Sequence, residues 1–335
     1  MDAAFSPVDQ IYSQHPVRRA DTTQRPRGRQ ANPRNLFLFS LQSLSPMRKA
    51  SYRPQSPIDV DIISVRENHT LMTDLDKLEA QTLYILREAY ARIGNLAMLW
   101  SIGKDSTALL WMVRKAFFGT IPFPLILLDT GMELDEVYAF RDQLVTEWKL
   151  PATSEPCPPE ESTDPSLPPA SRAAARKTEG LKNLINRNGY QGIFLGIRRD
   201  EQAMRAKERV FSPRSIDGQW DFRDQPPEFW DQYKTDFPEG VHVRIHPILQ
   251  WTELDIWRYT KREGIPIVPL YLARNGKRYR SLGEKNITFP VNSNADSIDA
   301  IIAELETTKT SERAGRARDH EAEDSFERLR ATGYM

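Results

Sequence analysis

The stretch that decides the fold of this chain is an apolar run followed at once by a short polar loop, Leu96-Ala97-Met98-Leu99-Trp100-Ser101-Ile102-Gly103-Lys104-Asp105-Ser106. The apolar run predicts a buried strand, and the spacing of Leu109, Met112 and Val113 after the loop predicts a helix. A loop between a strand and a helix directs backbone N–H groups and the positive end of the helix dipole at one point. The stretch therefore predicts an anion-binding loop.

This loop differs from a Walker A loop at two positions. Met98 stands where that motif needs its first Gly, and Asp105 stands where it needs Ser or Thr. Gly103 permits close approach of the backbone to a ligand, and Lys104 adds a full positive charge. An Asp in a phosphate loop is expected mainly where Mg²⁺ bridges it to the phosphates, so Asp105 is a candidate metal ligand. The motif alone leaves open a plain strand-to-helix turn with Asp105 near a helix N-terminus.

Composition bounds the class of protein. The 335 residues suffice for one large or two small domains, and they carry 46 basic and 46 acidic side chains. Residues 1–57 hold nine basic and three acidic residues, which leaves 37 and 43 for the rest of the chain. Because this main part is mildly acidic, it lacks the charge pattern of a general nucleic-acid binder, and no nucleic-acid partner is expected.

Cysteine content and hydropathy narrow the class further. The single cysteine, Cys157, excludes an internal disulfide framework and a multi-cysteine metal site, and it favours a cytoplasmic protein. No apolar run approaches the roughly 18–20 residues that would span a bilayer, so no membrane partner is expected.

The chain divides into three parts by composition. Residues 1–70 are rich in Arg, Gln, Ser and Pro without a sustained period, which predicts a disordered extension, or a spurious one with Met72 as the working start. A transit peptide is the alternative for this leader. We expect an α/β nucleotide-binding domain over residues 71–265 and, over residues 266–335, a C-terminal extension that completes the site and contacts a partner.

Strand and helix patterns alternate along the middle of the chain. The patterns predict strands over residues 96–100, 123–128, 193–195 and 243–248, and helices over residues 75–93, 104–118, 134–148, 176–188 and 298–305. A further helix is predicted from Thr252 onward, where Thr252 and Asp255 form a capping-box pattern. Residues 151–175 are predicted as a Pro-rich loop, and residues 212–240 as irregular surface structure. This alternation predicts an α/β fold, a mostly parallel sheet with helices on both faces.

Three polar clusters fall where predicted strands end, at residues 101–106, 129–131 and 198–209. Ligands of such sheets gather at the carboxyl ends of the strands, so each cluster is a candidate for ligand binding. Asp129 could accept hydrogen bonds from a ribose, orient its loop, or cap the next helix.

The third cluster is basic, with five cations in twelve residues: Arg198, Arg199, Arg205, Lys207 and Arg209. Arg holds phosphate or sulfate oxygens with paired donors. A solvated helix face with ion pairs is the alternative, but the position of the run beside the predicted phosphate loop favours anion binding. His242 and His246 are not expected to bind a metal, because no third ligand is evident.

The loop and several other segments together resemble a known protein family. The loop at residues 99–106 resembles the PP-loop of the ATP pyrophosphatase superfamily, and the whole of residues 72–335 resembles the small, catalytic subunits of heteromeric bacterial sulfate adenylyltransferases. The other segments that carry the resemblance are 123–125, 129–131, 177–182, 198–201, 205–209, 247–257, 267–271, 280–283 and 310–313. Residues 151–175, 274–277 and 284–287 depart from the family pattern.

The resemblance implies an adenine nucleotide alpha hydrolase-like fold of the PAPS reductase type. It implies that ATP and sulfate give adenylyl sulfate and pyrophosphate, with Mg²⁺ and with a GTPase large subunit as the partner in a heterodimer, as the first step of sulfate assimilation for cysteine synthesis or for sulfation. The nucleotide would be held by Ser101, Ile102, Gly103, Lys104, Asp105, Ser106, Asp129, Thr130 and Gly131. The catalytic residues would be Lys104, Asp105, Arg198 and Arg199, with Arg199, Arg205 and Arg209 on sulfate and Asp105 on the metal.

Two rival functions share this fold. A reductase of PAPS or adenylyl sulfate resembles a thiol enzyme with a nucleophilic Cys near its C-terminus, and no Cys follows Cys157 here. A non-catalytic nucleotide-binding subunit is the other alternative, and an intact Lys104, Asp105 and Arg cluster disfavours it.

Overall fold

The computed structural model describes residues 72–216 and 218–315. These residues belong to one compact unit of the chain that begins at Asn68. The expectations for the leader, residues 1–70, lie outside the described residues, as does the end of the C-terminal extension.

A six-stranded sheet forms the centre of the fold, with the strand order β3-β2-β1-β4-β6-β5. All neighbours pair in parallel except β5 and β6, which are antiparallel. The mostly parallel sheet predicted from the sequence is thus confirmed. The strands are β1 (Leu96–Leu99), β2 (Leu125–Asp129), β3 (Ala152–Pro156), β4 (Gly192–Phe194), β5 (Phe211–Arg214) and β6 (His242–Ile245).

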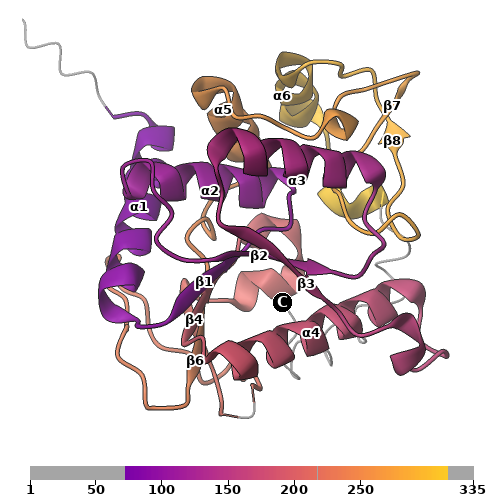
Figure 1. The fold of residues 1–335 in the computed structure, drawn as a ribbon. Coiled ribbons are helices and arrows are strands. Elements are labelled where there is room, and N and C mark those ends of the chain that lie inside the picture. The colour runs from indigo at the N-terminus through magenta and orange to yellow at the C-terminus, as the bar shows by residue number, and fades with distance from the viewer. Residues whose placement is uncertain (1–71, 217, 316–335) are drawn as a thin grey trace, which may run out of the picture. The chain divides into compact units, whose positions relative to one another are not determined.

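Helices cover both faces of this sheet, as predicted. In Figure 1, α2 and α3 lie over one face and α4 lies over the other. The α-helices are α1 (Asp74–Arg92), α2 (Lys104–Ala116), α3 (Asp135–Trp148), α4 (Pro169–Asn188), α5 (Glu253–Glu263) and α6 (Ile298–Thr307). The two short strands β7 (Lys277–Arg278) and β8 (Val291–Asn292) pair with each other outside the main sheet.

The order of the strands reverses between β1 and β4. From β1 the chain passes through α2 to β2 on one side, whereas β4 pairs with the other side of β1. Such a switch point leaves a crevice outside the carboxyl ends of the two strands. The loop at residues 101–106 and the start of the basic run at Arg198 follow directly after these two strands.

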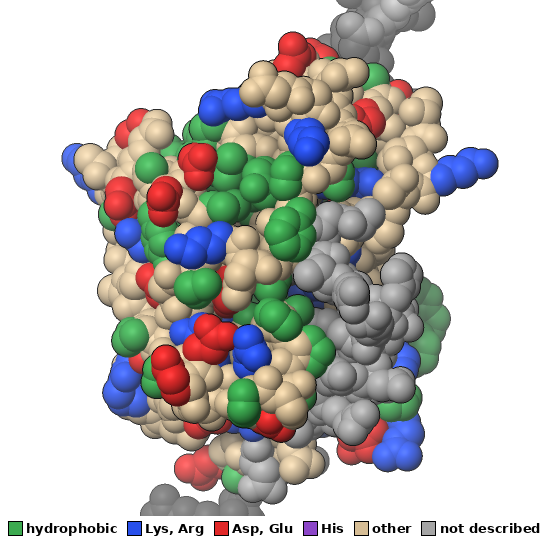
Figure 2. Space-filling model, turned by 90° about the vertical axis from the view of Figure 1, so that its right-hand side faces the viewer, with side chains coloured by type: hydrophobic (Ala, Val, Ile, Leu, Met, Phe, Trp, Pro, Cys, Tyr) green, Lys and Arg blue, Asp and Glu red, His purple; other side chains and the backbone are tan. Residues whose placement is uncertain are grey.

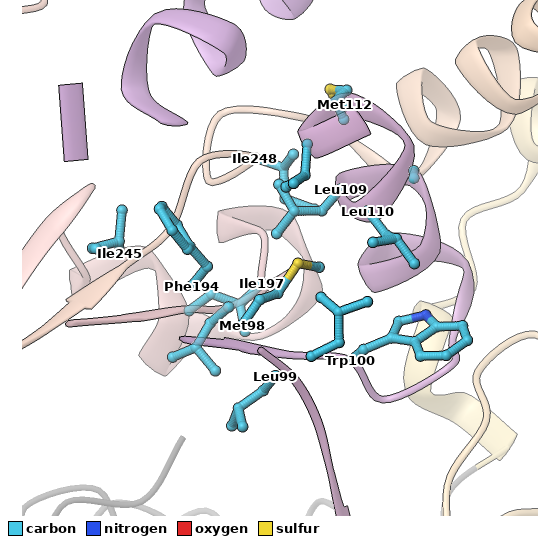
Figure 3. Packing of buried hydrophobic residues seen from close by; sticks show 14 of the residues in the cluster. Met98, Leu99, Trp100, Leu109, Leu110, Met112, Phe194, Ile197, Ile245 and Ile248 are labelled. Atoms are coloured by element: carbon cyan, nitrogen blue, oxygen red, sulfur yellow. The ribbon is translucent and has the colours of Figure 1, made fainter. Parts of the chain in front are cut away.

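Apolar packing fixes the elements that carry the loop. Figure 3 shows Met98 and Trp100 from the β1 segment against Leu109 and Leu110 of α2, with Phe194 beside them. All five side chains are buried, and strand β1 is apolar at every position because helices cover it from both faces. The indole N–H of Trp100 donates to Thr107 Oγ1 at 3.2 Å, which ties the strand to the helix on both sides of the loop.

Helix starts follow the local sequence signals. Thr73 and Asp76 form a capping box at α1, and Thr252 and Asp255 form the predicted one at α5. In the second box the Thr252 hydroxyl accepts the N–H of Asp255 at 3.1 Å.

Two predicted loops contain regular structure. Residues 151–175 were expected to be a loop, but β3 pairs with β2 at one edge of the sheet, and α4 begins at Pro169. An edge strand tolerates proline, and the first turn of a helix accepts it, so the prolines do not break these elements. Residues 212–240 likewise include β5, in which Pro213 lies on the opposite edge strand.

The surface carries charges of both signs. On the face shown in Figure 2, Lys and Arg side chains alternate with Asp and Glu side chains, and apolar side chains gather between them. This mixed surface agrees with the balanced composition of the chain. The cations that matter for the candidate site lie instead in cavities, as described below.

Candidate functional site

The loop between β1 and α2 is a strained bend. Ile102 has a φ of 65°, which is rare for a β-branched residue, and its side chain is fully buried. Gly103 caps α2 without a side-chain hydrogen bond, so the helix begins with backbone groups facing the crevice. A strained backbone conformation of this kind persists only where the surrounding structure fixes it, and such conformations are frequent at ligand-binding sites.

Gly196, just after β4, lies in close contact with the backbone at Ser106. A Cβ atom at Gly196 would lie 2.9 Å from Ser106 Cα and 3.0 Å from Ser106 N, closer than real contacts allow. A Cβ atom at Gly103 would meet only ordinary contacts, the nearest at 3.5 Å from Tyr271 Oη. The tight approach of backbone to backbone is therefore at Gly196, and glycine there lets the segment after β4 lie against the first turn of α2.

A buried network of ion pairs fills the crevice. Lys104 Nζ donates to Asp105 at 3.1 Å and also contacts the Glu312 carboxylate. The Arg198 guanidinium donates to Asp200 at 2.9 Å and further contacts Asp105 and Glu312. The structure thus brings the predicted residues Lys104, Asp105 and Arg198 together, and it adds Glu312 from far along the chain.

The network favours the charged forms of Arg198 and Glu312. Burial opposes the charge of Arg198, yet the carboxylates of Glu312, Asp200 and Glu253 raise its pKa above the ordinary value. Burial alone would raise the pKa of Glu312, but Lys104 and Arg198 lower it well below the usual range of a carboxyl. Because charge is so closely balanced here, an added anion has to replace one of these carboxylates or outcompete it.

Hydroxyl groups line the loop beside the ion pairs. The backbone N–H of Lys104, at the first position of α2, donates to the Tyr271 hydroxyl at 2.9 Å. The hydroxyls of Ser101 and Ser106 lie 3.1 Å apart, and that of Ser106 also donates to the Gly103 carbonyl at 3.2 Å. A phosphate oxygen accepts hydrogen bonds from the same kinds of donor, so the loop offers the groups that an anion site needs.

The segment after β2 is held by its own neighbours. Asp129 accepts the Gly131 N–H at 2.8 Å and the Tyr138 hydroxyl at 2.6 Å. Burial, with help from Asp129, raises the pKa of Tyr138 to about 12. The Thr130 hydroxyl donates to Glu284 at 2.8 Å. Asp129 therefore orients its turn. Its contact with a ribose, and nucleotide binding by Asp129, Thr130 and Gly131, stay predictions.

A cavity of about 180 Å³ opens on the loop. Its charged lining consists of three cations and four carboxylates: Lys104, Lys177, Arg205, Asp105, Glu133, Glu201 and Glu312. Buried Arg198, which contacts Asp105 from outside this lining, adds a fourth cation. Lys177 pairs with Glu133 at 2.9 Å, and Arg205 contacts Glu201. We call this space the loop cavity.

Arg199 and Arg209 lie elsewhere, in a second cavity of about 480 Å³. There Arg199 Nη2 lies 3.9 Å from the Glu228 carboxylate, and burial lowers the pKa of Arg199. The structure therefore divides the predicted cluster of cations. Arg205 lines the loop cavity and Arg198 contacts the lining residues Asp105 and Glu312, whereas Arg199 and Arg209 line the second cavity.

Comparison with known proteins identifies the family. Residues 95–290 match the model of the phosphoadenosine phosphosulfate reductase domain. The sulfate adenylyltransferase subunit 2 of Pseudomonas syringae pv. syringae is 39% identical over 303 residues, covering 79% of this chain and 99% of that protein. The Pseudomonas fluorescens SBW25 protein of the same name is 38% identical over the same shares. The chain belongs to the sulfate adenylyltransferase subunit 2 family.

This membership confirms the resemblance found in the sequence. Among solved structures, Candida glabrata FMN adenylyltransferase in complex with ATP has a TM-score of 0.47 at 15% identity, over 76% of this chain and 79% of that one. The Candida auris PAPS reductase in its phosphate complex has a TM-score of 0.42 at 16% identity, over 64% and 97%. At these values neither structure bears on the activity of this chain.

Three residues of the site were not predicted. Glu312 and Tyr271 belonged to segments that carried the family resemblance without an assigned role, and Gly196 directly follows the strand predicted over residues 193–195. Glu312 lies 208 positions from Lys104 and outside the matched reductase domain, so no local spacing connects the two.

The remaining candidates for chemistry are inert in this family member. Burial raises the pKa of the Cys157 thiol to about 11, which leaves little thiolate at neutral pH. Burial also lowers the pKa of His242 to about 3 and that of His246 to about 4, so both are neutral. Within residues 72–216 and 218–315, no group of three or more His, Cys, Asp or Glu could hold a metal, and no helix is long and apolar enough to cross a membrane.

Proposed function

We propose that this protein is the catalytic subunit of a heteromeric sulfate adenylyltransferase, and that the loop cavity is its ATP site. One observation carries the proposal. At the switch point of the sheet, Lys104 and Arg198 are buried beside the first turn of α2, in a chain of the sulfate adenylyltransferase subunit 2 family. Two fixed cations and a helix N-terminus together favour a group with several negative charges.

The reaction is a displacement at phosphorus. An oxygen of sulfate forms a bond to the α-phosphorus of ATP, the bond from that phosphorus to the bridging oxygen breaks, and pyrophosphate leaves. The loop at residues 101–106 would hold the β- and γ-phosphates, and Lys104 and Arg198 would offset the charge that develops on the leaving group. Because sulfate is already deprotonated at neutral pH, no general base is required.

Positioning supplies most of the rate in this proposal. Sulfate is a weak nucleophile and is repelled by the triphosphate, so the protein has to hold the two anions in line. Orientation of this kind can lower a barrier by about 7–11 kcal/mol. A rigid cradle suits the task, and the buried β1 and α2 on either side of the loop provide it.

Sulfate is assigned to Arg205, which lines the loop cavity and contacts Glu201. Arg199 and Arg209 line the second cavity, so we propose that they do not touch sulfate during the reaction, against the expectation from the sequence.

Mg²⁺ would enter with the triphosphate as part of the substrate. A single protein carboxylate suffices where phosphates and water supply the other ligands, and Asp105 is that carboxylate in the loop. Its two oxygens contact Lys104 and Arg198, so a metal could bind there only when these cations turn to the phosphates. The ion would reduce the negative charge of the leaving pyrophosphate.

A partner subunit with GTPase activity completes the proposal. Formation of adenylyl sulfate from ATP and sulfate is unfavourable, so the reaction needs a second source of free energy, and GTP hydrolysis would supply it. The relatives carry the name subunit 2, which indicates an assembly with another subunit. We further propose that the complex acts in the cytoplasm, at the start of cysteine synthesis or of a sulfation pathway.

Release of pyrophosphate tests this function. The purified chain, combined with its co-purifying partner and GTP, is expected to release pyrophosphate from ATP only when sulfate is present. ATP binding without sulfate-dependent release would support the non-catalytic alternative and contradict the proposal.

A further inference from the structure

Glu312 reaches the loop cavity from the C-terminal end of the described chain. It begins the short 3-10 helix Glu312–Gly315, which follows α6, and its side chain is 6% exposed. One carboxylate oxygen contacts Lys104 Nζ and the other contacts the Arg198 guanidinium. A single anion thus bridges the two cations of the site.

This contact conflicts with the proposed role of the same cations. The N–H groups of Lys104 and Arg198 that point at Glu312 cannot at the same time donate to a phosphate, because one N–H makes one good hydrogen bond. A carboxylate beside the phosphates would also repel them. The loop cavity of about 180 Å³ is smaller than the 300 Å³ or more of an ordinary ligand site, and Glu312 is part of its wall.

The segment that carries Glu312 passes from exposed residues to buried ones, since Glu312 and Arg313 are buried. Residues 309–311 are exposed. The Thr310 carbonyl accepts a hydrogen bond from Arg280 at 2.7 Å, and Arg313 lies 3.4 Å from the Glu201 carboxylate. Glu312 itself pairs with the two cations, and a phosphate can satisfy both of them equally well.

We propose that Glu312 is an internal substitute for phosphate, and that the β- and γ-phosphates of ATP expel it when they bind. The inference rests on the proposed function, because it assigns Lys104 and Arg198 to the nucleotide. Exchange of one anion for another keeps the two buried cations neutralised throughout. In the absence of nucleotide, Glu312 then keeps the site closed and reduces the apparent affinity for ATP and for pyrophosphate.

The opposite role is a permanent brace, in which Glu312 stays in place and orients Lys104 during the reaction. The two roles predict opposite results. Loss of a competing carboxylate increases the fraction of molecules with an open site and so tightens binding. Loss of a brace misplaces the lysine and weakens binding.

The test measures binding of inorganic pyrophosphate to the full-length chain by calorimetry. Glu312→Gln keeps the size of the side chain and removes its charge, and it is expected to bind pyrophosphate about 10-fold more tightly than the unchanged chain. The matched control is Glu306→Gln in α6, which removes a carboxylate from an exposed pair with Arg258 and is expected to leave the affinity unchanged.

Hydrogen exchange of the unchanged chain gives a second measurement that needs no variant. Pyrophosphate is expected to speed amide exchange over residues 308–313 and to slow it over residues 101–106. Slower exchange in both segments, or equal or weaker binding by Glu312→Gln, would overturn this inference alone and leave the nucleotide site standing. If neither chain binds pyrophosphate or ATP, the proposed function and the inference both fail.

Discussion

Arg198 and Arg199 are neighbours in the sequence, yet they lie at different cavities. Arg198 contacts the carboxylates of Asp105, Asp200 and Glu312, and its pKa is raised. Arg199 Nη2 lies 3.9 Å from the Glu228 carboxylate, and burial lowers the pKa of Arg199. The comparison teaches that a run of like charges in a sequence motif need not form one binding site. Consecutive side chains can point in different directions from the backbone and so meet different surroundings.

The largest effect is expected at the loop cavity itself. Lys104→Ala removes the cation nearest the first turn of α2, and pyrophosphate release is expected to fall by about 10²–10³-fold, as when one preorganised donor is lost from a reacting site. The measurement is sulfate-dependent pyrophosphate release by the complex. The control is Lys261→Ala, which removes a lysine from an exposed pair with Asp299 and is expected to keep the rate. Near-normal turnover of Lys104→Ala would refute the role of the loop.

The second prediction contrasts the two cavities directly. Arg205→Ala is expected to raise the KM for sulfate by about 10–100-fold while changing the KM for ATP little, because a lost charged hydrogen bond to a substrate costs about 1.5–3 kcal/mol. Arg199→Ala, in the second cavity, is expected to change either constant by less than about threefold. The reverse pattern in steady-state kinetics would move the sulfate site to the second cavity.

Local signals in the sequence were enough to predict most of the elements. The strand, loop and helix around residues 96–116 follow from an apolar run and a 3.6-residue period, and the Thr252 capping box was read from two residues. β3 and β5 were missed because each is a short edge strand that contains proline, and its partner strand, not its own pattern, defines it.

The site was only partly predictable for a related reason. Lys104, Asp105 and Arg198 follow strand ends, and the topology of a parallel sheet brings strand ends together. Glu312 follows no strand of the sheet and enters from the C-terminal segment, so its place depends on tertiary packing alone. The split between Arg198 and Arg199 depends on one backbone turn, which charge patterns do not reveal.

The third prediction concerns the contact that holds the loop cavity in shape. Gly196→Ala places a methyl group against the backbone of Ser106, so the first turn of α2 has to move. We expect a loss of about 1–3 kcal/mol in the free energy of unfolding and about a 10-fold fall in activity. The control is Gly264→Ala, whose positive φ costs stability but whose Cβ meets nothing within 4 Å, far along the chain from the loop. Equal activity losses in the two variants would show that Gly196 acts through stability alone.

The smallest expected effect is on the pH dependence of the free energy of unfolding, which distinguishes the region near Arg209 from the loop cavity. His246 follows β6, its Nδ1 lies 2.7 Å from the Arg209 carbonyl oxygen, and its pKa is lowered to about 4. Burial lowers the pKa of His242 to about 3. Between about pH 6.5 and pH 4 the unfolded chain binds protons at these histidines while the folded chain does not. The free energy of unfolding is therefore expected to fall with decreasing pH in this range, by at most about 1.4 kcal/mol per pH unit for each histidine.

Glu312 behaves differently over the same range. Its lowered pKa keeps the carboxylate ionised, so its contribution to stability is present above the ordinary carboxyl value of about 4.5 and is lost only as the pH falls below it. Urea unfolding at several pH values measures how the free energy of unfolding depends on pH, for the unchanged chain, for His246→Leu and for Glu312→Gln. The variant is expected to show a shallower loss between pH 6.5 and pH 5, whereas Glu312→Gln is expected to keep the slope of the unchanged chain there. A shallower slope for Glu312→Gln in this range, with an unchanged slope for His246→Leu, would mean that the loop cavity, and not the region near Arg209, senses mild acid.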